Sequence, residues 1–85
     1  MARYSIETKL PAAKVLERAE RFFGEEGIGL KVTSRGEAAL CIEGTEGYVT
    51  FSTCTSEVKG KRKTIDLEIE TNGYDSLVRR FLTTL

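Results

Sequence analysis

The sequence contains no histidine and no tryptophan, and it has only one proline, one methionine and two cysteines among its 85 residues. The absence of histidine removes the side chain that most often acts as a general base and as a transition-metal ligand. The two thiols, Cys41 and Cys54, lack Cys-x-x-Cys spacing and a histidine that would activate them. The sequence therefore predicts no catalytic residue, no metal site and no cofactor, and it favours a non-catalytic protein over an enzyme.

An excess of charge of either sign is also absent, because 13 Lys and Arg residues balance 13 Asp and Glu residues. A chain without net charge creates no overall field that would attract nucleic acid or acidic lipid. No stretch approaches the ~20 consecutive apolar residues of a membrane helix. The first residues lack the apolar block of a signal peptide. We therefore expect a cytoplasmic protein with reduced thiols and no membrane partner. The scarcity of Asn, Gln and Met beside abundant charge also resembles the composition of thermophile proteins.

Hydrophobic periodicity predicts five strands and two helices. Apolar residues alternate in the strand segments and recur every three or four positions in the helical segments. Glycine-containing stretches separate the last four strands, and Pro11 precedes the first helix. Asn72 or Asp75 is expected to cap the second helix. The predicted strands are 3–10, 30–33, 37–43, 48–54 and 64–70, and the predicted helices are 12–23 and 74–85.

These segments predict one α+β domain over residues 1–85. Each strand has one apolar face and both helices are amphipathic, so the economical arrangement packs both helices on one face of a five-stranded antiparallel sheet. The order of elements is β-α-β-β-β-β-α. Three hairpins place the last four strands in sequence, and the first strand is then expected to pair at an edge, beside the last strand.

A two-residue loop at Thr45 and Glu46 would set the register of the central strands. It places Ile42 opposite Val49 and Leu40 opposite Phe51, which matches apolar residues on one face. The same register places Cys41 opposite Thr50 and Cys54 opposite Glu37, on the face away from the helices. The two thiols are then staggered by about four residues, or ~13 Å at ~3.3 Å per residue, which is too far for a disulfide.

The outer face of the predicted sheet has a small, weakly polar centre and an acidic flank. Arg3 and Lys9 would offset the flank if the first strand pairs there. The centre is either a docking surface, for example for a second copy of the chain, or a solvated sheet face rich in Thr and Ser. The centre comprises Ala39, Cys41, Thr50, Ser52 and Cys54, and the flank comprises Asp66, Glu68 and Glu70.

Two segments carry a resemblance to a known family. Residues 4–15 resemble the opening of START-like proteins, in which a strand ends at a Pro or Ala pair and a helix with Lys-Val follows. Residues 74–82 are similar to the C-terminal helix of those proteins. With the order of elements, the chain resembles a miniature form of the START-like helix-grip superfamily (SRPBCC, polyketide-cyclase-like), and its topology resembles that of TATA-binding-protein-like domains.

The resemblance to START-like proteins implies a shallow apolar groove between the C-terminal helix and the sheet, which would take a small apolar ligand. TATA-binding-protein-like domains bind DNA with the sheet face opposite their helices. Here that face has acidic residues that would repel phosphates, so nucleic acid is disfavoured as a partner. The groove would be formed by Tyr4, Thr8, Phe51, Thr53, Thr55, Tyr74 and Phe81, and the acidic residues are Glu37, Glu43, Asp66, Glu68 and Glu70.

Several functions stay open at this point. The first hypothesis is a small binding or interaction module, with either the groove or the outer sheet face as its site. The second is a self-associating structural protein, a homodimer through the outer face. The third is weak nucleic-acid binding through the basic hairpin tip, whose simpler interpretation is a charged tip that keeps a sheet edge soluble. The tip comprises Lys59, Lys61, Arg62 and Lys63.

Overall fold

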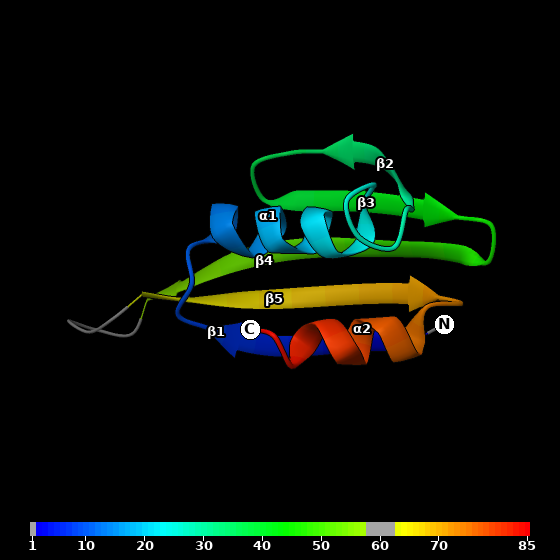
Figure 1. Cartoon of the computed structure of the whole chain (residues 1–85). Helices are drawn as coiled ribbons and strands as arrows, with labels where there is room; N and C mark the ends of the chain where they lie inside the picture. The colour runs from blue at the N-terminus through cyan, green and yellow to red at the C-terminus, as the bar shows by residue number, and fades with distance from the viewer. Residues whose placement is uncertain (1, 58–62) are drawn as a thin grey trace.

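The computed structural model describes residues 2–57 and 63–85, without the side chains of residues 55–57 and 63. Its elements follow the predicted order β-α-β-β-β-β-α, so the predicted α+β fold class is confirmed (Figure 1). The described elements are β1 (Ala2–Thr8), α1 (Ala12–Phe23), β2 (Lys31–Arg35), β3 (Ala39–Gly44), β4 (Gly47–Glu57), β5 (Lys63–Asn72) and α2 (Asp75–Leu82).

The strands form one antiparallel sheet in the order β1-β5-β4-β3-β2. The predicted register of the central hairpin is confirmed, since Ile42 is opposite Val49 and Leu40 is opposite Phe51. The prediction that the first strand pairs beside the last is confirmed too, by the β1–β5 ladder. The predicted pair of Cys54 and Glu37 lies beyond the β3–β4 ladder, which begins at Ala39 and Ser52.

An irregularity in β2 corrects the sequence prediction there. The register shifts between Val32 and Ser34, so that Ser34 is opposite Cys41 and Arg35 is opposite Leu40. The extra residue of a β-bulge reverses the alternation that follows it. Arg35, which the sequence placed in a turn, is therefore a strand residue on the helix side of the sheet. Ala38, predicted to point inward, precedes β3 and is exposed.

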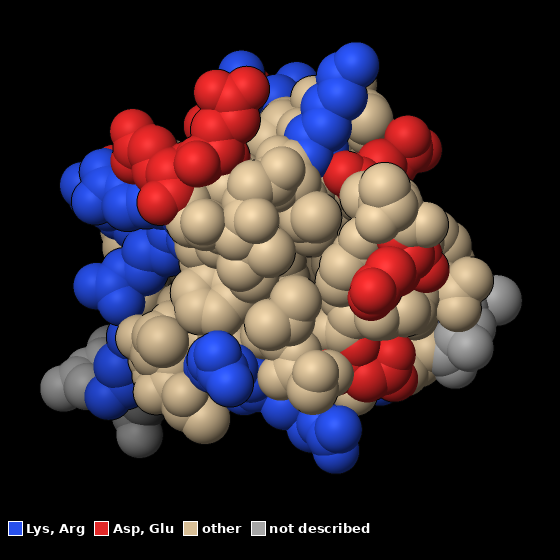
Figure 2. Space-filling view, turned by 45° about the vertical axis from the view of Figure 1, so that its right-hand side comes forward, with Lys and Arg blue, Asp and Glu red and all other residues tan. Residues whose placement is uncertain are grey.

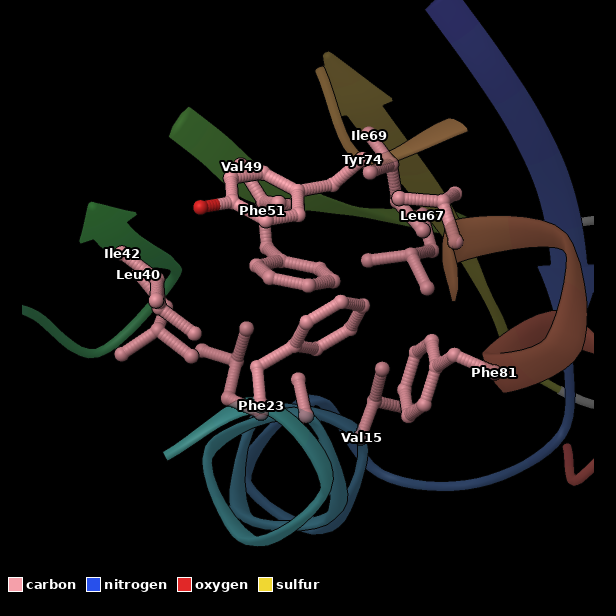
Figure 3. Packing of buried hydrophobic residues seen from close by; sticks show 13 residues of the cluster. Val15, Phe23, Leu40, Ile42, Val49, Phe51, Leu67, Ile69, Tyr74 and Phe81 are labelled. Atoms are coloured by element: carbon pink, nitrogen blue, oxygen red, sulfur yellow. The ribbon is translucent and has the colours of Figure 1, made fainter. Parts of the chain in front are cut away.

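Both helices cover the same face of the sheet, with α1 over β3 and β4 and α2 alongside β5 (Figure 1). The core between the two layers is closely packed (Figure 3). Three buried phenylalanine rings meet at its centre and a fourth, partly buried ring packs against them, with neighbouring centroids 4.9 to 5.8 Å apart. The buried rings are Phe23 from α1, Phe51 from β4 and Phe81 from α2, and the partly buried ring is Phe22 from α1. Burial of such rings is the largest apolar contribution to a small core.

Among the described residues, one polar side chain is fully buried in this core. The Thr71 side chain is completely inaccessible, and its hydroxyl donates a hydrogen bond of 2.8 Å to the carbonyl oxygen of Tyr48. A buried hydroxyl with a partner costs little, whereas one without a partner costs ~1–3 kcal/mol. Strand alternation alone identifies Thr71 as inward-facing, opposite Val49.

The start of α2 differs from the prediction that Asn72 or Asp75 caps it. Tyr74 occupies the N-cap position and no side chain caps the helix. The phenol of Tyr74 instead accepts a hydrogen bond of 3.1 Å from the backbone N–H of Glu46 in the β3–β4 turn. A Cβ atom on Gly44 would overlap the Tyr74 hydroxyl oxygen. The glycine therefore makes room for the contact that joins the start of α2 to the central hairpin.

Gly47 closes the two-residue turn in a conformation that other residues rarely adopt. Its φ is +152°, and a Cβ there would overlap the carbonyl oxygen of Asn72. We predict that Gly47→Ala lowers the free energy of unfolding by about 1–3 kcal/mol, because it adds backbone strain and a clash with β5. Urea denaturation followed by circular dichroism measures the change.

Gly36→Ala is the matched control, because a Cβ at Gly36 meets only one atom, at 3.7 Å, and its φ is not positive. We expect it to change the free energy of unfolding little. Equal destabilisation by the two substitutions would contradict the described turn geometry.

Candidate functional site

The residues predicted to form a groove beneath the C-terminal helix contribute mainly to packing. Phe51, Tyr74 and Phe81 are buried in the core, and the rings of Phe51 and Phe81 are 5.8 Å apart. Tyr4 and Thr53 are half-buried and lie opposite Ile69 and Leu67 of β5.

The remaining predicted site residues have other environments or lie outside the described part. The hydroxyl of Thr8 accepts a hydrogen bond of 3.2 Å from the backbone N–H of Leu10, just after β1 ends. The side chain of Thr55 lies outside the described residues. The same holds for the predicted basic tip of Lys59, Lys61, Arg62 and Lys63.

The acidic flank of the outer face is as alternation predicted, because Asp66, Glu68 and Glu70 alternate with the buried residues of β5. Glu37, predicted for the same face, instead precedes β3 and lines a hollow between α1 and the sheet. Cys54 is exposed, Cys41 is half-buried, and neither forms a disulfide. Arg3 forms an ion pair of 3.2 Å with Glu70, as expected from the pairing of β1 with the acidic flank. A small hollow of about 170 Å³ beside this ion pair is lined by Arg3, Thr50, Ser52, Glu68, Ile69 and Glu70.

A larger concave feature, which the sequence did not reveal, runs between α1 and the β2 edge of the sheet. It consists of two hollows of about 550 and 280 Å³ that share Glu17, Glu20 and Arg35 as lining residues. We call this feature the α1–β2 trough. A third hollow of about 440 Å³ adjoins its end at Leu30 and Lys31.

The trough exists because the sheet extends one strand beyond the helix that covers it. α1 contacts β3 and β4, whereas β2 lies further out (Figure 1). One face of α1 lines the trough, since positions 13, 16, 17, 20 and 21 recur at three- and four-residue steps. Ala13 and Gly36 are too small to fill the space between the helix and the strand.

The floor of the trough is apolar and its rim is charged. Leu30 and Val32 are partly buried against the core and leave apolar surface at the floor. The rim has five carboxylates and three basic groups, so the surface is acidic although the whole chain is neutral. The carboxylates belong to Glu17, Glu20, Glu25, Glu26 and Glu37, and the basic groups belong to Arg21, Lys31 and Arg35.

Ion pairs already engage several of these rim groups. Arg35 of β2 reaches across the trough to Glu20 of α1, and Arg21 pairs with Glu17 at 3.4 Å and with Glu26 at 3.9 Å. Glu25 and Glu37 form no ion pair with another described residue. In Figure 2, acidic and basic side chains alternate along the upper margin of the molecule, the side on which β2 lies in Figure 1.

The loop that follows α1 gives the trough a fixed end. The backbone N–H groups of Ile28 and Leu30 donate to the carbonyl oxygens of Phe22 and Phe23, which would otherwise lack partners at the helix end. Gly27 allows this close approach, because a Cβ there would overlap the carbonyl oxygen of Phe22. The loop therefore holds Leu30 in the floor of the trough.

Comparison of the chain with protein-family models, with curated proteins and with solved structures found no match in any of the three. The START-like resemblance therefore stays a prediction. None of the described helices has the length and apolar character needed to cross a membrane. In the described part of the chain, no three or more Cys, Asp or Glu side chains are grouped so that they could hold a metal ion.

The placement of the thiols generates a prediction about their reactivity. Cys54 is exposed and Cys41 is half-buried between β2 and β4, so we expect a disulfide-exchange reagent to modify Cys54 several-fold faster. The variants Cys41→Ser and Cys54→Ser show which thiol gives the fast phase of modification and which gives the slow phase.

Mass spectrometry after mild oxidation is expected to find no disulfide within the chain, because the two thiols are staggered along the sheet. An intrachain disulfide would contradict the register.

Proposed function

We propose that this protein is a non-catalytic interaction module that holds an extended, basic segment of another protein in the α1–β2 trough. The observation that carries the proposal is the position of the trough, which lies between a helix and an edge strand and combines an apolar floor with an acidic rim. We place the module in the cytoplasm, where both thiols stay reduced.

The shape of the trough favours an extended segment over a compact ligand. Among the described strands, β2 pairs only with β3, so its other edge has backbone groups available to a further strand. Many recognition domains add a peptide to a sheet edge, where main-chain hydrogen bonds supply affinity and side-chain pockets supply specificity. A peptide beside Lys31 and Val32 would pair ahead of the bulge and place alternate side chains on Leu30 and Val32.

The charge of the rim favours basic residues in that segment. Glu25 and Glu37 lie near opposite ends of the trough and have no described ion-pair partner, so they are available to Lys or Arg side chains of a ligand. Charge complementarity of this kind contributes to association rate and specificity more than to affinity. The expected ligand alternates apolar and basic residues.

Binding beneath α2, the site that the family resemblance implies, is a weaker alternative. The aromatic rings of Phe51 and Phe81 are in contact and their side chains are buried, so they serve packing. A ligand there would first have to separate those rings, which costs the apolar burial they provide. In the trough, a ligand would meet the exposed ion pair between Arg35 and Glu20, and breaking such a pair costs less than separating buried rings.

A pair of synthetic heptapeptides tests the proposal. We expect a peptide of alternating Lys and Val to shift the backbone amide resonances of residues 28–37 and of α1 in an NMR titration. A peptide of alternating Glu and Val, with equal length and apolar content, is expected to bind at least several-fold more weakly because the rim repels it.

Charge reversal in the protein sharpens the test. We expect the double substitution Glu25→Lys and Glu37→Lys to weaken binding of the Lys–Val peptide roughly five- to thirty-fold, which corresponds to loss of two exposed charge contacts and their replacement by repulsion. Glu68→Lys on the outer sheet face is the matched control and should leave binding nearly unchanged. Shifts confined to the outer face, or equal effects of the trough and control substitutions, would refute the proposal.

A further inference from the structure

The two edge strands of the sheet, β2 and β1, differ in length and in regularity. The β2 edge is five residues long and interrupted by a bulge, so a regular ladder with another strand could extend there only over the two residues ahead of the bulge. The β1 edge is seven residues long, contains no proline and keeps an unbroken register with β5 from Ala2 to Thr8. A regular edge of this length leaves a row of outward N–H and C=O groups available to another strand.

The sequence of β1 is complementary to itself when two copies run antiparallel. With the two-fold axis at Ser5, Arg3 of one copy is opposite Glu7 of the other, and the pair occurs twice by symmetry. On the helix side, Tyr4 is opposite Ile6 of the second copy, a favourable aromatic and β-branched pair. All seven residues of β1 find a partner, since Ala2 is then opposite Thr8.

Two neighbouring registers also keep the outer-face residues of the two copies opposite each other, but they lack this complementarity of charge. Moving the axis to Ile6 places Arg3 opposite Lys9 of the second copy and Glu7 opposite Ser5, so that like charges meet. Moving it to Tyr4 pairs Arg3 with Ser5 and leaves Glu7 without a partner in the opposing strand. The charges therefore select the axis at Ser5.

The charges within one copy point to the same arrangement. Glu7 is directly opposite Asp66 in the β1–β5 ladder, so two carboxylates face each other across neighbouring strands. Like charges at such positions are destabilising. Arg3 lies opposite Glu70, with which it forms its ion pair, and its side chain is still 73% exposed. An Arg3 side chain from a second copy would lie beside Glu7 and offset the repulsion.

We propose that a second copy of this chain pairs antiparallel with β1 around Ser5, which joins two five-stranded sheets into one of ten strands. The partner is selected by the Arg3–Glu7 pairs on the outer face and the Tyr4–Ile6 pairs beneath α2. The proposal concerns the edge opposite the α1–β2 trough and is independent of the function proposed for the trough.

Complementary charge-reversal variants test this pairing by sedimentation. The wild-type chain is expected to dimerise as its concentration is raised to roughly 1 mM. At such concentrations even a dimer with a millimolar dissociation constant is detectable. Arg3→Glu alone brings a second carboxylate against Glu7, and Glu7→Arg alone brings two guanidinium groups together. Each single variant is expected to raise the dimer dissociation constant roughly tenfold or more, because attraction becomes repulsion at two symmetric pairs.

Mixing the two variants supplies the decisive result. One chain then presents two carboxylates and the other two guanidinium groups, so the mixture is expected to form a heterodimer that is tighter than the homodimer of either variant. Circular dichroism and urea denaturation of each variant check that its fold persists. Ser52→Lys, in the centre of the outer face, is the control and should leave the wild-type dimer intact.

Three outcomes would overturn the proposal. They are a wild-type chain that stays monomeric throughout the concentration range, folded single variants that dimerise as well as the wild type, and a dimer that Ser52→Lys dissociates. The last result would assign association to the outer sheet face instead of the β1 edge.

Discussion

The packing of four phenylalanine rings is the interaction on which the rest of the structure depends. Phe23 contacts rings from its own helix, from β4 and from α2, so one side chain connects both layers and both helices. In a domain of this size a single core supplies most of the stability, and few other contacts could replace it. The positions of both helices, and therefore the hollows and edges around them, follow from this cluster.

The cluster lies over the middle of the sheet, and this leaves the two edge strands with different surroundings. β2 extends beyond α1 and borders an acidic trough, whereas β1 continues the sheet at the other side with a regular, self-complementary sequence. If both proposals hold, the dimer presents two troughs at the distal edges of a ten-stranded sheet. Such an arrangement would bind a protein with two basic segments more tightly than one trough alone.

Strand alternation was sufficient to predict much of the fold. The two-residue loop at Thr45 and Glu46 matched apolar residues in only one register, and the same reasoning placed Arg3 beside the acidic flank. Alternation failed at β2, because a bulge adds one residue without a distinctive sequence and thereby turns Arg35 toward α1. The predicted cap of α2 failed because Tyr74 is held by a contact from Glu46, which is 28 residues distant.

The candidate site was less accessible to sequence reasoning than the fold. The trough is made by the offset between α1 and β2, which is a tertiary feature, and none of its residues forms a motif. The available signal was the spacing of Ala13, Glu17 and Glu20 on one face of α1, where small and acidic residues replace the apolar ones that a fully covered helix face would require. That spacing indicates an uncovered face but does not identify the neighbouring strand.

The pairing of β1 with β5 also has a consequence for how the chain reaches its native state. Thr8 pairs with Ile65 and Ala2 with Thr71, which are 57 and 69 positions away. Closing such a long loop carries a large entropic cost before any contact offsets it, and topologies of this kind fold slowly. During synthesis β1 therefore cannot pair with β5 until residues 63–72 have emerged from the ribosome, and until then the backbone edge of β1 that faces β5 is unpaired.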